Sequence, residues 1–146
     1  MEKTAKRDFK VGDEIYVVDY WGAAAFEAYA QIIQVNHEKQ NFLAVLYGDT
    51  YKTYCFKDYG RLIFDTKQKA IQAAYLLPKP TSFVWQIIGN RVYKKTVLNI
   101  SSRYINGATD LVIELNKGKE VSIKEIDVTI FKNEQQARKI VNSKTD

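Results

Sequence analysis

The feature of this sequence that most constrains its fold is an internal repeat. Short segments of the first half recur in the second half in the same order: 11–16 beside 88–93, 30–36 beside 95–101, and 56–70 beside 123–137. A repeat at a fixed period marks one structural unit that is present more than once. Two copies of about seventy residues each are near the lower size at which one core is sufficient. We therefore expect the copies to pack on each other or on a partner.

The spacing between matching positions changes along the chain. The step is 77 residues from Gly12 to Gly89, but 65 from Val35 to Ile100 and 67 from Phe64 to Phe131. The change predicts an insert of about twelve residues in the first copy, at about 18–29, because surface connections accept insertions at low cost. Such connections often carry function.

Local patterns predict short strands and one terminal helix in each copy. Runs of β-branched and aromatic residues alternate with turn residues, as in a small barrel or a strongly bent sheet. Asn106-Gly107 predicts a hairpin turn. Thr66 and Asn133 are placed as helix N-caps. The only prolines lie in Pro78-Lys79-Pro80, which predicts a stiff linker between domains at 9–77 and 81–143.

The motifs at the two ends of the first copy resemble a known family. The Val-Gly-Asp opening at Val11, and the closing pattern of Phe64, Thr66 and Ala70, are similar to those of short, mostly uncharacterised proteins. These proteins occur in Gram-positive bacteria, their phages and mobile elements, and are identified as SH3-like or KOW-like barrels followed by a helix. The second copy departs from the pattern, with Asn90 for the acidic residue and Asn133 for the threonine.

The resemblance and the repeat together predict a mainly β fold of two tandem SH3-like barrels, each with about five short strands and a C-terminal helix. SH3-like barrels bind peptides, nucleic acid or other proteins, so the fold does not determine the function. The sequence has no run of eighteen apolar residues and no signal peptide, and it has a single cysteine. These features predict a cytoplasmic protein that does not enter a membrane.

The predicted insert is rich in aromatic residues, which are enriched at binding interfaces. We predict a protein-binding surface formed by Tyr20, Trp21, Phe26 and Tyr29. The alternatives are that these side chains plug the end of the first barrel or the gap between the two copies, or that Ala23 to Ala25 make the insert a short helix packed on the core.

The net charge of +5 comes entirely from the second half. Residues 1–77 carry ten basic and ten acidic side chains, whereas residues 78–146 carry twelve and seven. Basic side chains neutralise phosphates and aromatic rings stack on unpaired bases. The predicted nucleic-acid or polyanion site consists of Arg91, Tyr93, Lys94, Lys95, Arg103 and Tyr104. The alternative is an ordinary solvated hairpin with half-buried tyrosines.

Catalytic and metal chemistry finds little support in the sequence. The single histidine, His37, lies in a polar turn, and the single cysteine, Cys55, lies in a predicted strand as a buried apolar residue. One histidine and one cysteine cannot form a zinc site, and there is no phosphate-binding loop or nucleophile elbow. We expect no enzyme activity, no metal and no cofactor.

The sequence therefore predicts a non-catalytic binding protein that acts by surface occlusion or bridging. The first copy would bind a host or phage protein, and the second would contact a polyanion. An alternative partner is a nucleic-acid-bound complex. One alternative is a phage or mobile-element inhibitor of a host defence nuclease such as a CRISPR effector. Another is an accessory protein that binds single-stranded nucleic acid. The sequence leaves the oligomeric state open.

Overall fold

The structure, a computed structural model, describes residues 7–21 and 24–144. It is mainly β, with three antiparallel sheets and two helices in this part of the chain. The chain divides into two compact units. The first unit contains the chain up to Leu77 together with Ser102–Asp110, and the second contains Pro78–Ser101 and the chain from Leu111 onward. The segment 102–110, which the sequence assigned to the second domain, thus groups with the first unit.

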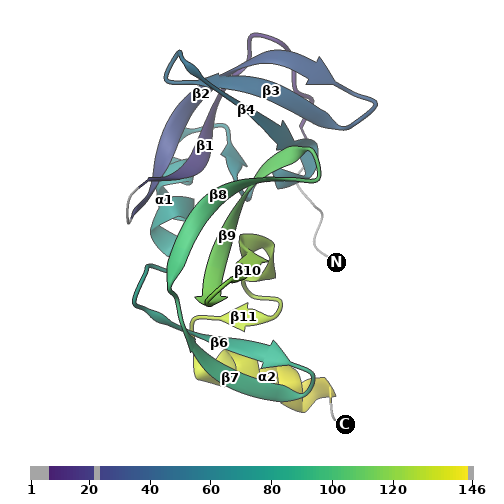
Figure 1. The fold of residues 1–146 in the computed structure, drawn as a ribbon. Coiled ribbons are helices and arrows are strands. Elements are labelled where there is room, and N and C mark those ends of the chain that lie inside the picture. Colours follow the sequence, from purple (N-terminus) through teal and green to yellow (C-terminus); the bar gives the residue numbers. More distant parts are fainter. Residues whose placement is uncertain (1–6, 22–23, 145–146) are drawn as a thin grey trace. The chain divides into compact units, whose positions relative to one another are not determined.

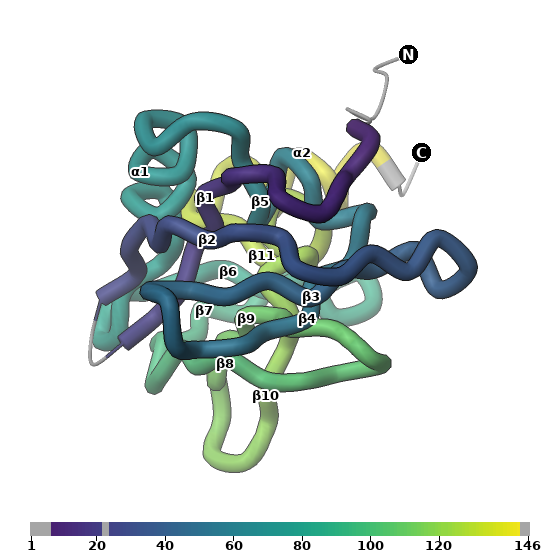
Figure 2. The backbone as a smooth tube through the Cα atoms, turned by 90° about the horizontal axis from the view of Figure 1, so that it is seen from above, coloured from purple at the N-terminus to yellow at the C-terminus, as the bar shows by residue number. Residues whose placement is uncertain are grey.

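The first unit is built on one five-stranded sheet with the order β4-β3-β2-β1-β5. Its strands are β1 (Glu14–Trp21), β2 (Ala24–Asn36), β3 (Asn41–Leu46), β4 (Thr50–Cys55) and β5 (Ile63–Phe64). Figure 2 shows β2 between its two neighbours; its first part pairs with β1 and its last part with β3. The strands β4 and β5 form the two ends of this order, so the described sheet is open and not a closed barrel.

Alternation along the strands separates two faces of this sheet, because successive side chains point to opposite sides. The inner face holds fully buried apolar side chains from β1, β2 and β3, among them Ile15, Ala30 and Phe42. Helix α1 (Lys67–Leu76) packs on β1 and β2 and buries Ala70.

The second half contains two three-stranded sheets, β11-β6-β7 and β10-β9-β8. The elements are β6 (Phe83–Ile88), β7 (Arg91–Thr96), β8 (Asn99–Ile105), β9 (Ala108–Asn116), β10 (Lys119–Ser122), β11 (Ile130–Phe131) and α2 (Glu134–Lys144). Helix α2 lies against β6 and β7 (Figure 1) and covers a core that includes Ile87, Phe131 and Ala137. The predicted Asn106-Gly107 turn is confirmed, with φ values of 53° and 84° that suit a two-residue hairpin.

The closing parts of the two halves have the same construction. A short 3-10 helix follows β4 at Phe56–Asp58 and β10 at Ile123–Glu125. The next turn is closed by Gly60 N–H donating to Ile63 O at 2.8 Å, and by Asp127 N–H donating to Ile130 O at 2.8 Å. The two segments that the sequence comparison matched, 56–70 and 123–137, thus contain the same order of elements.

The predicted helix caps are also confirmed. The Thr66 side chain accepts a hydrogen bond from Lys69 N–H at 3.3 Å. The Asn133 side chain accepts from the N–H groups of Gln135 and Gln136 at 2.8 and 3.3 Å. Each cap satisfies backbone donors that have no partner within their own helix.

The predicted match of Gly12 with Gly89 is wrong. Gly12 N–H donates to Ile32 O at 2.7 Å, and the corresponding bond of the second half runs from Thr81 N–H to Val97 O at 2.8 Å. Gly12 thus corresponds to Thr81, whereas Gly89 lies in the β6–β7 turn. The sequence comparison failed because glycine marks any turn with positive φ, and Thr81 adopts such a φ, 73°, without being glycine.

The predicted insert at 18–29 is also wrong, because its length was derived from the match of Gly12 with Gly89. These residues belong to β1 and β2, apart from residues 22 and 23, which lie outside the described residues. The β1–β2 hairpin has eight paired positions, from Glu14↔Gln31 to Trp21↔Ala24. The β6–β7 hairpin has six, from Phe83↔Thr96 to Ile88↔Arg91. The real difference is a longer hairpin, with two more residues on each strand.

Candidate binding surfaces

The four aromatic residues predicted to bind protein all lie on the β1–β2 hairpin, but on opposite faces. Trp21 and Phe26 share the inner face, because Phe26 pairs with Asp19 and side chains alternate along each strand. Tyr20 and Tyr29 belong to the outer face, where Tyr29 pairs with Tyr16. The four side chains therefore do not form one surface.

The two outer-face tyrosines have structural roles. Tyr29 donates its hydroxyl hydrogen to Glu14 Oε1 at 2.6 Å, and this hydrogen bond is the main reason that its pKa lies above the ordinary value. Its ring meets Tyr16 edge-on at 5.9 Å. The Tyr20 hydroxyl is buried with no hydrogen-bond partner among the described residues, and burial raises its pKa. The Tyr20 hydroxyl is therefore shielded from solvent, whereas Tyr29 is 42% exposed and its hydroxyl is held by Glu14.

The inner-face aromatic group is different. We use this name for Trp21, Phe26 and Tyr47. Trp21 is 83% exposed and Tyr47 is 55% exposed, and the Phe26 and Tyr47 rings stack with centroids 6.4 Å apart. A group of large aromatic side chains exposed to solvent is unusual on a protein surface and indicates a binding site. Sequence analysis missed Tyr47, because only its stacking with Phe26 places it in the group.

An ion pair lies on the same inner face. Lys52 Nζ is 3.0 Å from Asp19 Oδ1, and both side chains are largely buried. The same amine is 3.4 Å from Ser102 Oγ, within the first unit. The pair supplies a polar element beside the aromatic group, which is the composition typical of a binding surface with apolar anchors and polar surroundings.

The six predicted polyanion-binding residues are divided by the structure. Arg91, Tyr93, Lys94 and Lys95 lie on β7. Arg103 and Tyr104 are exposed on β8, within the segment that groups with the first unit. The six residues therefore do not all belong to one compact unit.

Three of the β7 residues form a row on one face of the strand. Alternation places Arg91, Tyr93 and Lys95 together, and we call these three the basic row. Tyr93 is 41% exposed, and Lys95 Nζ lies 5.7 Å from the centroid of its ring. The cross-strand partners on this face are uncharged, and the chain contains no Asp or Glu between Pro78 and Thr109. No carboxylate of this hairpin competes for the two cations.

Lys94 belongs to the other face of β7. Its Nζ lies 4.1 Å from the centroid of the Phe83 ring and 6.0 Å from that of Trp85. A cation over an aromatic face is held by the quadrupole of the ring. Lys94 thus packs on the side that faces α2 and is not part of the basic row.

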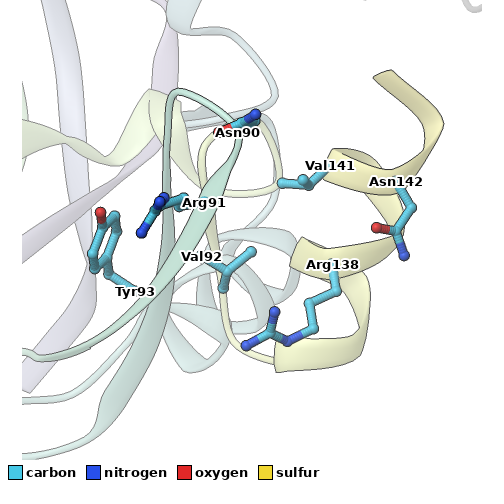
Figure 3. Close-up of a pocket in the computed structure, with 7 residues that line it drawn as sticks. All are labelled: Asn90, Arg91, Val92, Tyr93, Arg138, Val141 and Asn142. Carbon is cyan, nitrogen blue, oxygen red and sulfur yellow. The ribbon is translucent and has the colours of Figure 1, made fainter. Parts of the chain in front are cut away.

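A pocket of about 380 Å³ lies between β7 and α2 (Figure 3). Figure 3 shows Val92 and Val141 on the side between strand and helix, whereas Arg91 and Tyr93 point away from the helix. Arg138 donates to Glu134 Oε2 at 2.7 Å along the helix. The pocket is lined by Asn90, Arg91, Val92, Tyr93, Arg138, Val141 and Asn142. Sequence analysis could not find the α2 members, because only the packing of the helix brings them to β7.

The residues considered for catalysis are not assembled into a reactive group. His37 is exposed in the turn between β2 and β3, with its ring 5.9 Å from that of Phe56. Cys55 ends β4 and is half-buried, more accessible than the buried side chain that we predicted. Over residues 7–21 and 24–144, no group of three or more His, Cys, Asp or Glu side chains could hold a metal ion.

No helix in the described part of the chain is both long and apolar enough to span a membrane. Comparison with known proteins gave no match to a family model and no match to a curated protein.

Proposed function

We propose that this protein is a non-catalytic binding protein with two chemically different surfaces, built from two copies of one SH3-like module. The shared order of elements supports the duplication: in each half a 3-10 helix, a two-residue strand and a helix follow the longer strands. The equivalent hydrogen bonds at Gly12 and Thr81, and at Gly60 and Asp127, support it independently.

The observation that carries the proposal is an exchange of side chains at equivalent positions. With Gly12 matched to Thr81 and Ile32 to Val97, the first-half residues Phe26, Ala28 and Ala30 correspond to the basic row. Ala28 and Ala30 are fully buried, whereas Tyr93 is 41% exposed. A core position of one copy has become a cationic surface in the other, and the lost core burial is a cost that a binding function would explain.

The basic row is suited to a polyanion. Two cations flank one exposed ring on a hairpin without carboxylates, so each cation would gain a charge-assisted contact with an anionic group. The ring also favours single-stranded nucleic acid as one form of this polyanion, because bases stack on exposed aromatic side chains.

The inner-face aromatic group is suited to a protein partner. Trp21 offers a large apolar surface, and tryptophan is enriched among the residues that dominate interface energetics. With two separate surfaces, the protein would act by bridging two ligands or by covering part of one complex.

The test of the polyanion surface is a charge-reversal experiment. We expect Arg91→Glu with Lys95→Glu to abolish binding of fluorescein-labelled oligothymidine and of poly-L-glutamate, measured by anisotropy over a series of salt concentrations. The matched control is Lys117→Glu with Lys119→Glu, because both lysines are exposed around the β9–β10 turn and the charge change is identical. Equal binding by the two double variants would refute the assignment.

The test of the protein surface is capture from a Gram-positive bacterial lysate, with and without nuclease, by the wild type and by Trp21→Ser. We expect one protein that survives nuclease treatment and is lost with Trp21→Ser. Captured material that disappears with nuclease, and is unaffected by Trp21→Ser, would refute the assignment of Trp21 and leave the basic row as the main surface.

A further inference from the structure

We infer that β7 is a docking strand that pairs with an extended acidic segment of a partner protein. In this arrangement the partner adds one strand to the β11-β6-β7 sheet, with carboxylates opposite Arg91 and Lys95 and an aliphatic side chain in the pocket beside Val92 and Val141. The inference rests on the proposed polyanion function of the basic row and names its ligand.

The first support is the place of β7 in its sheet. It pairs with β6 over its whole length, from Arg91 to Thr96, and ends the described strand order β11-β6-β7. A strand at a sheet edge presents a row of backbone N–H and C=O groups that another chain can pair with. Peptide recognition by strand addition uses these groups for affinity and the alternate side chains for specificity.

The second support is the difference between the two sides of β7. Arg91 and Tyr93 point to one side, and Val92 points to the side of the pocket beneath α2 (Figure 3). Alternation along β7 places Lys95 on the same side as Arg91 and Tyr93. An added strand alternates in the same way, so every second side chain would meet the basic row, at Arg91, Tyr93 or Lys95, while those between would face Val92 and Val141. Arg91 and Lys95 are four residues apart on β7, a distance of about 13 Å along an extended strand. The carboxylates opposite them would therefore be four residues apart in the partner, with one further residue on the same face opposite Tyr93.

The third support is the charge of the edge. Basic side chains on an edge strand discourage pairing with a second identical edge, because like charges would be placed opposite each other. The same charges favour an acidic strand, and no Asp or Glu lies between Pro78 and Thr109 to neutralise them. Strand pairing at the β7 edge is therefore unfavourable with a second copy of this chain and favourable with an acidic partner.

These features favour a peptide over a nucleic acid. A nucleic acid would use the two cations and the Tyr93 ring, but it has no main chain that could pair with the strand edge. It also has no aliphatic side chain for the pocket beside Val92 and Val141. An alternating peptide uses the cations, the edge and the pocket together.

The experiment uses the full chain and three synthetic peptides of equal length and charge. The first alternates Glu with Val, the second has the same composition with the glutamates in one block, and the third is the first with N-methyl groups at alternate backbone nitrogens. Binding is measured by calorimetry, and protection of the β7 amides by hydrogen exchange. We expect the alternating peptide to bind at least about tenfold more tightly than either control, because only it combines main-chain pairing with charge-assisted contacts. Its binding should protect the β7 amides.

The variants keep the inference separate from the proposed function. Arg91→Glu with Lys95→Glu should remove binding of the alternating peptide, whereas Lys117→Glu with Lys119→Glu should leave it unchanged. Equal affinity for the alternating and blocked peptides, with no added protection of β7, would overturn strand addition while polyanion binding stands. Binding of oligothymidine but of none of the peptides would overturn the peptide in favour of nucleic acid. Failure of every anionic probe would overturn both proposals.

Discussion

The β1–β2 and β6–β7 hairpins show how one backbone arrangement can serve either as core or as surface. In the first hairpin, β2 continues past Ile32 in its pairing with β3, and its inner-face residues Ala28 and Ala30 are fully buried. In the second, β7 ends at Thr96, and β8 belongs to a separate sheet. The corresponding face of the second hairpin is buried at Val84 but partly exposed at Tyr93. A small apolar side chain would gain little at the partly exposed positions, because only removal from water stabilises it.

The side chains follow this difference in burial. Ala30 is fully buried at the position where Lys95 is half-buried. A lysine can lie at such a position only where its amine reaches water or a partner, since burial of an unpaired charge is very costly. The comparison therefore predicts that exchanges at equivalent positions will have strongly unequal effects.

The largest expected effect is that of Ala30→Lys. It places a charged side chain in the fully buried inner face of β2, and we expect a loss of roughly 3 kcal/mol or more in the free energy of unfolding. The reverse exchange, Lys95→Ala, removes a half-buried side chain and should cost less than about 1 kcal/mol. Urea denaturation followed by circular dichroism measures both. Equal losses of stability would mean that the inner face of β2 and the basic-row face of β7 do not differ in how much charge they tolerate.

The next effect separates the two inner-face aromatic residues of the first hairpin. Phe26 is half-buried and stacks on Tyr47, so Phe26→Ser should lower the free energy of unfolding by about 2 kcal/mol. Trp21 is 83% exposed, so Trp21→Ser should change it by no more than about 0.5 kcal/mol. The measurement is thermal unfolding of the two single variants. A large loss with Trp21→Ser would show that this ring is core and would remove it from the binding surface.

The sequence predicted features that depend on neighbouring residues, but it did not predict features that depend on contacts between distant segments. The Asn106-Gly107 turn and the Thr66 and Asn133 caps were predictable, because each rests on the conformational preferences of a few neighbouring residues. The match of Gly12 with Gly89 failed, because turn glycines look alike in sequence while hydrogen bonds across the sheet define the register.

The candidate sites show the same limit. Alternation alone could have separated Arg91, Tyr93 and Lys95 from Lys94, since the period of two is visible in the sequence once β7 is recognised. The separation of Arg103 from these residues, and the approach of Arg138 to β7, depend on contacts between segments far apart in the chain. No local pattern carries that information.

A smaller effect than that of Phe26→Ser concerns Tyr54, which corresponds to Val121 when the two 3-10 helices are matched. The Tyr54 ring is buried in the first half, and its hydroxyl has no hydrogen-bond partner among the described residues. A buried unpaired hydroxyl costs stability, so Tyr54→Phe should raise the free energy of unfolding by about 0.5 to 1 kcal/mol at neutral pH. A loss of that size would mean that the hydroxyl has an unrecognised partner, and that the two halves differ less here than Tyr54 and Val121 indicate.

The Tyr54 side chain should also make the free energy of unfolding depend on pH. Burial raises the pKa of Tyr54 far above its ordinary value, with further contributions from Asp19 and other neighbours. The folded state therefore holds the neutral form, while the unfolded chain ionises near pH 10. Stability that is fully present below about pH 10 should fall as the pH rises above that value, because only the unfolded state then releases the proton. Tyr54→Phe should lose less stability than the wild type between about pH 9 and pH 11, measured by urea denaturation at each pH. Parallel losses in the two proteins would place the alkaline sensitivity elsewhere, and Tyr59, whose pKa is also raised, through its hydrogen bond to Asp65, would be the next residue to test.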